Sequence, residues 1–343
     1  MKPTIKSVAK LAGVSFKTVS RVINNEPSVG DDLREKVWKA VKELDYQPNL
    51  SARHLRGASS FIGFIYDNPN SHYVIEMQHG ILDECHRQGY QLVIHPCDAN
   101  SAALTDDLVS MVEHGQLAGL VLTPPISEDE TIVQGLYEKG VNFVRIISGS
   151  GETDGRSPCV FVDDHAASVE IIQHLIDLGH TRIGFLTGDM THKSTLQRLA
   201  GYKEALENNK LPVTNELIIE GQFSFESGVA RTQHLLGLEN PPTAVYACND
   251  EIAAGTLFAA RLMGVEVPKR LSIVGFEDSP FSRQTWPKLT TARQPNSDIA
   301  ASATSLLIQS TRSTRKGKTP NKVSDKGYLP QLVIRDSTFS PGN

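Results

Sequence analysis

Two patterns of hydrophobic and polar positions divide the chain, and they change near residue 60. Before that point, apolar residues recur at helical spacing in short runs, first at Val8, Ala9 and Ala12 and then at Val19 and Val22. After it, short continuous apolar runs alternate with longer amphipathic stretches. This alternation is typical of parallel strands and the helices that cover them. The sequence therefore predicts a small helical domain followed by a larger α/β domain.

The first two helical runs predict a pair of helices joined by a tight turn. Thr4 and Ser15 can cap them, since a side-chain hydroxyl accepts hydrogen bonds from the unpaired N–H groups of a first turn. Gly13 between them can end a helix in the left-handed conformation. The outer face of the second helix carries Phe16, Lys17, Ser20 and Arg21. Such a face suits the DNA major groove. An ordinary helical hairpin with a solvated basic face is the alternative.

Two further helices are expected before the pattern changes. Asp32–Asp45 is amphipathic, and Asn49–Gly57 offers a capping asparagine, about two turns and a glycine stop. So short a helix is marginal in water, so we expect it to order only on a partner. One face and its flanks carry Ala52, Arg53, Leu55 and Arg56. An apolar wedge flanked by arginines fits the DNA minor groove.

The second pattern predicts two wound subdomains, because roughly 280 residues is too much for one such sheet. Ligand groups then belong at the carboxyl ends of strands, in a cleft. Residues 311–326 are polar and are expected to form a loop, and Lys326–Thr338 a closing strand. The expected earlier strands are Phe61–Tyr66, Gln91–His95, Gly119–Thr123, Asn142–Ile147, Val160–Val162, Arg182–Thr187, Leu217–Glu220, Ala244–Cys248 and Ser272–Phe276.

Charge supports this division. Residues 1–60 contain 11 Lys or Arg against 6 Asp or Glu, so this segment carries +5 while the whole chain carries −5. A basic end on an acidic protein is what a local nucleic-acid contact requires. No apolar run approaches membrane-spanning length, and no signal peptide is apparent. We therefore expect a cytoplasmic protein.

Other chemistries fit poorly. The four cysteines are far apart and form no metal-binding pattern. Paired acids occur at Asp163–Asp164 and Glu277–Asp278, but neighbouring strand residues point to opposite faces and do not flank one glycosidic bond. No nucleophile elbow or phosphate-binding loop appears. We expect no catalytic site, no metal and no cofactor.

The motifs as a set resemble the LacI/GalR family of bacterial transcription regulators. The resemblance runs through Val-Ala-Lys-Leu-Ala-Gly-Val-Ser, Thr-Val-Ser-Arg-Val-Ile-Asn, Leu-Asp-Tyr-Gln-Pro-Asn and Ala-Arg-His-Leu-Arg-Gly, and later through Ala247-Cys-Asn-Asp and Ser272-Ile-Val-Gly-Phe. Gly30 and Leu33 depart from it, since serine and threonine are usual there. The resemblance implies a helix-turn-helix headpiece (1–48), a hinge helix and linker (49–60) and a periplasmic-binding-protein-like core (61–343).

That core would consist of two doubly wound α/β subdomains, 61–159 with 292–325 and 160–291 with 326–340, joined by three crossings. The resemblance further implies that Phe16, Lys17 and Arg21 face base edges and that Leu55 intercalates. The remaining DNA-binding candidates are Thr4, Lys6, Ser15, Thr18, Ser20, Asn24, Asn49, Ala52, Arg53 and Arg56.

Effector-binding candidates follow first from chemistry. A neutral, sugar-sized ligand needs planar hydrogen-bonding groups and an aromatic or apolar wall. Strand ends and helix starts supply Asp67, Asp98, Thr123, Arg198, Phe223, Asn249 and Glu277. The family pattern adds Tyr73, Val74, His192 and Ser194, and Glu277 stands where aspartate is usual. For any of these a loop cap or surface role is the alternative, and for Asp67, His72 and Asp164 it is an equal one.

The function expected from these features is a homodimer that binds double-stranded operator DNA and represses carbohydrate-utilisation genes until a sugar releases it. A regulator that needs a purine-like corepressor, or an activator, is the alternative within the same fold. A transport-type binding protein would not need residues 1–57, and a sugar-processing enzyme lacks its catalytic residues here.

Overall fold

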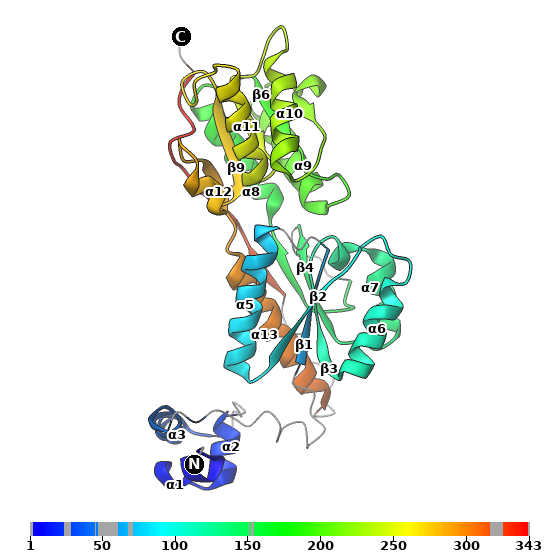
Figure 1. The fold of residues 1–343 in the computed structure, drawn as a ribbon, viewed down its shortest axis with the longest axis vertical. Helices are drawn as coiled ribbons and strands as arrows, with labels where there is room; N and C mark the ends of the chain where they lie inside the picture. Colours follow the sequence, from blue (N-terminus) through cyan, green and yellow to red (C-terminus); the bar gives the residue numbers. More distant parts are fainter. Residues whose placement is uncertain are drawn as a thin grey trace.

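The computed structural model describes residues 3–23, 29–44, 46, 61–67, 71–149, 151, 154–315 and 325–341. Within these ranges the chain forms a helical N-terminal domain and a core of two α/β sheets, which follow each other along the long axis in Figure 1. This arrangement confirms the predicted fold class. No helix in the described ranges has the length and apolarity needed to cross a bilayer.

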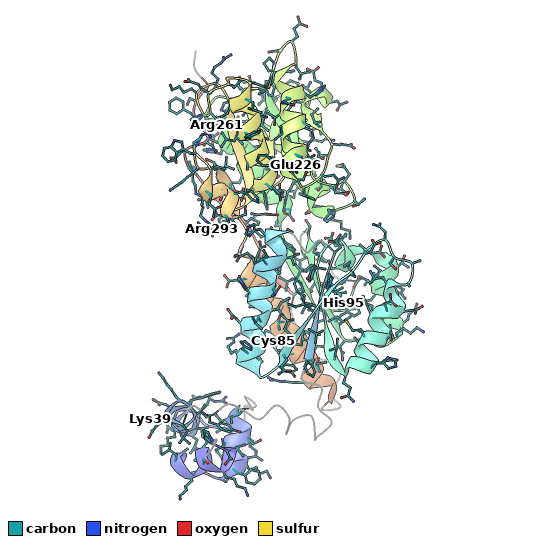
Figure 2. The ribbon with its side chains drawn as sticks, in the orientation of Figure 1. Lys39, Cys85, His95, Glu226, Arg261 and Arg293 are labelled. Carbon is teal, nitrogen blue, oxygen red and sulfur yellow. The ribbon has the colours of Figure 1, made fainter. Side chains whose placement is uncertain are left out.

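The N-terminal domain packs α1 (Ile5–Ala12), α2 (Phe16–Ile23) and α3 (Asp31–Glu43) around a small apolar core. The outer face of α3 carries charged side chains such as Lys39, which is labelled in Figure 2. The side chains that are fully buried at the centre are Val8, Val19, Val22 and Val37. This core is the one that the helical spacing predicts.

The helix ends of this domain follow from their cap residues. Thr4 and Ser7 form a capping box at the start of α1, and Gly13 ends the helix with φ 65°. The Ser15 hydroxyl accepts the N–H of the residue three positions on at 3.0 Å, which caps α2. Gly30 offers α3 no side-chain cap, but the two aspartates that follow it lie in the first turn, where their charge favours the helix dipole.

The first sheet of the core is parallel, with strand order β11-β5-β4-β3-β1-β2. The helices α5 (His72–Gln88) and α13 (Asn296–Arg315) cover one face, and α6 (Leu104–Gly115) and α7 (Glu130–Glu138) cover the other (Figure 1). The strands are β1 (Phe61–Tyr66), β2 (Gln91–Pro96), β3 (Leu117–Leu122), β4 (Phe143–Ser148), β5 (Cys159–Val162) and β11 (Lys326–Tyr328).

The second sheet has the order β12-β10-β9-β8-β6-β7, with only β12 antiparallel among the described pairs. Its helices pair as α8 (Asp164–Asp177) with α9 (Lys193–Asn208) and α10 (Phe225–Leu236) with α11 (Asp250–Leu262). A short α12 (Pro280–Gln284) follows β9. The strands are β6 (Ile183–Leu186), β7 (Ile218–Ile219), β8 (Ala244–Ala247), β9 (Ser272–Glu277), β10 (Thr290–Arg293) and β12 (Gln331–Val333).

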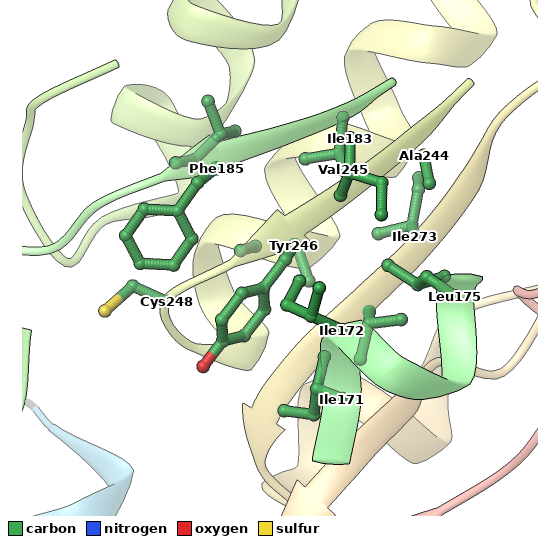
Figure 3. Close-up of a cluster of buried hydrophobic side chains, with 14 of the residues drawn as sticks. Ile171, Ile172, Leu175, Ile183, Phe185, Ala244, Val245, Tyr246, Cys248 and Ile273 are labelled. Carbon is green, nitrogen blue, oxygen red and sulfur yellow. The ribbon is translucent and has the colours of Figure 1, made fainter. Parts of the chain in front are cut away.

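The apolar strand residues of the second sheet are covered by α8. Figure 3 shows Ile171, Ile172 and Leu175 of this helix beside the side chains of β6, β8 and β9. Leu175 follows Ile171 and Ile172 by four and three positions, so the three share one helix face, and all of them are fully buried. The cluster fixes α8 on the sheet and so places its first residue, Asp164, beside the ends of the strands.

The crossings between the two sheets differ from the predicted boundaries. β5 pairs with β4 in the first sheet, so the chain crosses after Val162, two residues beyond the predicted boundary. It crosses back after Arg293, because β10 belongs entirely to the second sheet, and crosses again after β11, which pairs with β5. Assigning residues 160–162 and 326–328 to the second subdomain was therefore wrong. A short apolar run suits either sheet, and only pairing decides between them.

Two predicted segments also change. Lys326–Thr338 is not one strand: β11 and β12 lie in different sheets, and Pro330 between them lacks the N–H that a continuous ladder would need. Residues 311–315 belong to α13, not to a loop. The predicted hinge segment 49–60 lies outside the described residues and stays a prediction.

Candidate functional site

A cavity of about 310 Å³ lies in the cleft between the two sheets. Asp67 follows β1, Ser148 ends β4, Asn249 follows β8 and Glu277 ends β9, so the carboxyl ends of strands from both sheets meet there, as expected for parallel sheets. The other lining residues are Ser71, Tyr73, Val74, Pro124, Ile146, Ile147, Val162, Asp164, His192, Ser194, Arg198, Phe223, Ser224, Glu251 and Gln294.

A buried ion pair forms one side of the cavity. Arg198 of α9 donates from Nε and Nη2 to Asp164 Oδ1 at 2.8 and 2.7 Å, and Nη1 donates to the Cys248 carbonyl at 2.5 Å. Its guanidinium carbon lies 3.6 Å from the centroid of the Phe276 ring. The second carboxylate oxygen of Asp164 accepts the Ser148 hydroxyl from the first sheet. This network joins the two subdomains and fixes the polar groups that a ligand would meet.

Glu277 brings a carboxyl group without a partner into the cavity. Its backbone has φ 106°, a strained conformation for a residue with a side chain. No other residue in the described ranges hydrogen-bonds to the carboxyl. Burial raises the pKa of Glu277 to about 8, and Arg198 opposes this increase. At neutral pH the group is therefore mainly protonated, so it can donate as well as accept a hydrogen bond.

Aromatic side chains form another wall. The His192 and Phe223 rings meet edge to face, with centroids 5.4 Å apart. Burial lowers the pKa of His192, which keeps this ring neutral. A Cβ at Gly188 would lie 2.0 Å from the Phe223 ring, so glycine is required for the ring to occupy this place. Tyr73 contributes the opposite, first-subdomain side, and burial raises the pKa of its phenol.

Asn249 serves the local fold as well as the cavity. Its Oδ1 accepts the Ile252 N–H at 2.9 Å and caps α11. The side-chain amide nitrogen is the part that stays available to a ligand. The cap also fixes the side-chain torsions, so this amide is held in place before a ligand arrives.

Two predicted effector residues do not line this cavity. Asp98 follows β2, which is the outermost strand of its sheet, and it is therefore exposed. Its carboxylate accepts the Asn100 N–H at 2.9 Å. Thr123 is buried, and its hydroxyl donates to the Ile65 carbonyl at 3.0 Å. The other nine candidates, from Asp67 to Glu277, all line it, and so does Asp164.

Sequence reasoning missed several lining residues. Ser148 lies at the end of a strand, so the rule that found Asp67 applies to it too. Glu251 stands two positions after Asn249, in the first turn of α11. Gln294 lies in the second crossing, which the sequence analysis placed too early in the chain. No group of three potential metal ligands occurs among the residues that the structure describes.

Most of the predicted DNA-binding residues that the structure describes are solvent-exposed. Phe16 is 56% exposed, and Lys17 and Arg21 of the same helix are exposed too. Thr4 and Lys6 on α1 are exposed, whereas Thr18 and Ser20 are half-buried. The hydroxyls of Thr4 and Ser15 already accept cap hydrogen bonds. The remaining candidates lie outside the described residues, namely Asn24, Asn49, Ala52, Arg53, Leu55 and Arg56.

Comparison with known proteins covers both parts of the chain. Residues 4–49 match the model of "Bacterial regulatory proteins, lacI family", and residues 172–338 match that of the "Periplasmic binding protein-like domain". The Ribose operon repressor of Haemophilus influenzae is 32% identical over 98% of this chain and 99% of its own. The chain belongs to the lacI family. It is a DNA-binding transcriptional regulator with an effector-binding core.

Further relatives of this lacI-family regulator agree in length and fold. The HTH-type transcriptional repressor PurR of Actinobacillus pleuropneumoniae is 31% identical over 97% of this chain and 98% of its own. Among solved structures, the transcriptional regulator CelR–cellobiose complex matches with TM-score 0.72 and 27% identity over 98% and 99% of the two chains. The lac repressor dimer bound to operator and the anti-inducer ONPF matches with TM-score 0.73 and 26% identity over 99% and 100%.

Proposed function

We propose that this regulator represses carbohydrate-utilisation genes and that a neutral sugar in the cleft releases it from its operator. The charge of the cavity carries the proposal. Asp67 and Glu251 add carboxylates to the lining, whereas Arg198 is already paired with Asp164. Such a lining repels phosphates and carboxylates. Hydroxyl groups, which both donate and accept, satisfy it.

The names of the relatives support a sugar as the effector, and they also leave one alternative effector. One relative is named for the ribose operon, and the CelR structure contains cellobiose. Relatives named PurR have similar identities, so a purine-like corepressor is the second candidate. The flat rings of Phe223 and His192 and a protonated Glu277 suit a neutral heterocycle as well.

For DNA binding we propose a homodimer on a near-palindromic operator, in the bacterial cytoplasm where the chromosome lies. The N-terminus of α2 would enter the major groove, where Phe16, Lys17 and Arg21 face the bases. The hinge helices would open the minor groove with Leu55. The exposure of Phe16 and the lac repressor dimer on its operator support this arrangement.

The cleft would couple the two activities. Its lining comes from both subdomains, so a bound ligand favours one angle between them, and this angle sets the spacing of the two hinges. Coupling of this kind is a difference in ligand affinity between two states, and it is reciprocal. Operator DNA should therefore weaken inducer binding by the same factor by which inducer weakens operator binding.

The test begins with an operator selected from random duplexes by the purified full-length protein. Fluorescence anisotropy then measures operator affinity at several salt concentrations, with a panel of neutral mono- and disaccharides and with adenine and guanine as purine probes. We expect affinity to fall steeply with salt and to fall again with one saccharide. Tighter binding with a purine and no response to sugars would establish the alternative instead.

A further inference from the structure

A second cavity, of about 220 Å³, lies beside the effector cavity where the chain crosses back from β10 to α13. Tyr73, Glu277 and Gln294 line both cavities and so form their common border. His72 from the first turn of α5 lines only the second cavity, as does Arg293, which Figure 2 labels between the two sheets. Both subdomains therefore contribute to this hinge cavity.

Two residues that line the hinge cavity have a buried polar side-chain atom without a partner. Gln294 is only 8% exposed, and its Nε2 donates to Asn296 at 2.7 Å, yet its buried Oε1 has no partner within the described ranges. The buried Nδ1 of His72 also has no hydrogen-bond partner within the described ranges. Buried polar atoms in proteins are nearly always hydrogen-bonded. Two such atoms, in residues that line one small cavity, leave hydrogen-bonding capacity that a guest in this cavity would use.

The charges of the hinge cavity limit the kind of guest. Arg293 Nε donates to Asp278 Oδ2 at 2.7 Å, and Arg283 Nη1 donates to the Asp278 carbonyl at 2.5 Å. Asp278 therefore binds both arginines that line the hinge cavity. Glu76 and Asp298 add two more carboxylates. Arg335, outside the lining, also pairs with Asp278, so the arginines and carboxylates of this region balance. A mixture of donors and acceptors without net charge suits neutral hydroxyl groups.

We propose that the effector is an oligosaccharide of at least two units, which spans both cavities. One unit occupies the main cavity against Phe223, and the next passes Tyr73 and Gln294 and hydrogen-bonds in the hinge cavity beside His72. The inference rests on the proposed carbohydrate effector and specifies its length. Both subdomains line the hinge cavity, so the contacts of the second unit further stabilise one angle between the two subdomains.

The experiment combines ligand length with a variant of the hinge cavity. Isothermal titration of the full-length protein compares glucose with cellobiose and cellotriose, glucose with maltose, and galactose with lactose. His72→Ala removes one group of the hinge cavity, and His79→Ala, an exposed histidine on the same helix, is the matched control. Phe223→Ala tests the main cavity. Thermal unfolding of each variant shows that it is folded.

One disaccharide should bind at least about tenfold more tightly than its monosaccharide, as one or two added hydrogen bonds allow. His72→Ala should reduce that ratio severalfold and leave monosaccharide affinity unchanged, while Phe223→Ala weakens both ligands alike. A monosaccharide that binds as tightly as its disaccharide overturns the two-unit effector alone, and so does a His72→Ala protein that weakens both ligands equally. If no saccharide of any length binds, the proposed carbohydrate effector is wrong and this inference falls with it.

Discussion

Individual residues of the cleft contribute both to the stability of the fold and to ligand recognition. Arg198 is 4% exposed and Asp164 is 2% exposed, so each holds the other's charge away from water. Breaking a buried pair from one side leaves an uncompensated charge and typically costs about 3–5 kcal/mol, whereas replacing both partners costs far less. The Arg198–Asp164 pair is therefore needed for the stability of the fold, whether or not a ligand is bound.

Arg198→Met should lower the free energy of unfolding by about 3–5 kcal/mol and remove the effector response. The double variant Asp164→Leu with Arg198→Met should recover much of that stability without recovering the response. Urea unfolding followed by circular dichroism measures the first effect, and operator release measures the second. A single variant as stable as the parent would show that the pair does not stabilise the fold.

Phe223→Ala should separate recognition from stability. Losing this half-buried aromatic wall weakens ligand binding by about ten- to a hundredfold, since covering such a side chain contributes about 1.5–3 kcal/mol. Operator affinity without effector should stay at the parent value. Titration calorimetry and anisotropy check the two quantities, with the 59% exposed Phe339→Ala as control. Unchanged ligand affinity would exclude this wall from the site.

Glu277 should make stability depend on pH. Its pKa is raised from 4.5 to about 8, so between those values the folded protein binds a proton that the unfolded chain has lost. This contribution to stability declines as pH rises through that window and is constant above it. Glu277→Gln should therefore gain stability relative to the parent from pH 5 to pH 8. Melting temperatures across pH 5–9 check this, and parallel curves would refute it.

At the scale of elements, the close packing of α5 against α13 shapes the hinge cavity. A Cβ on Gly80 of α5 would lie 2.1 Å from the Ser297 carbonyl oxygen of α13, so only glycine lets these helices approach as they do. The same helices form the wall of the hinge cavity. Their spacing therefore determines both the core of the first subdomain and the border of the cleft.

Gly80→Ala should push α5 and α13 apart and destabilise the protein by about 1–3 kcal/mol, as overpacked cores do. Gly115→Ala is the matched control, because its Cβ would meet only ordinary contacts at 3.6 Å at the end of α6. Denaturant unfolding compares the two variants. Equal stabilities would mean that the helices adjust without cost.

The elements could be predicted from sequence, and their assignment to the two sheets could not. Apolar runs such as 244–247 and helix patterns such as 225–236 are local, and the structure confirms them. Whether Cys159–Val162 pairs with β4 or with β6 is a long-range choice that no local pattern contains. The site follows the same division. Strand ends located Asp67 and Glu277, whereas Gln294 became visible only once the crossing was placed.

At the scale of the whole molecule, DNA affinity and ligand affinity belong to separate parts of the chain. Residues 1–60 carry a net charge of +5 and the rest of the chain a net negative charge, while the described effector cavity lies entirely beyond residue 60. Changes in one part should alter the other only through the coupling between states. A variant of the predicted hinge helix tests this separation directly.

Leu55→Gly should weaken operator binding by more than about tenfold, or about 1.4 kcal/mol, because the minor-groove wedge is lost. Effector affinity in the absence of DNA should not change. Anisotropy and calorimetry on the same preparation measure both quantities, with Ser59→Gly as control. Parental operator affinity in Leu55→Gly would remove the wedge from the mechanism.

The order in which the chain crosses between sheets also bears on its synthesis. Residues 61–162 supply five strands of the first sheet, but Ile299, Ala303 and Leu307 of α13 complete its core, and β11 joins its edge last. A nascent chain that has emerged only to residue 290 therefore presents a sheet with one apolar face half uncovered, a surface prone to aggregation. Ribosomes that stall or terminate in this stretch would release a chain that chaperones must hold or proteases remove.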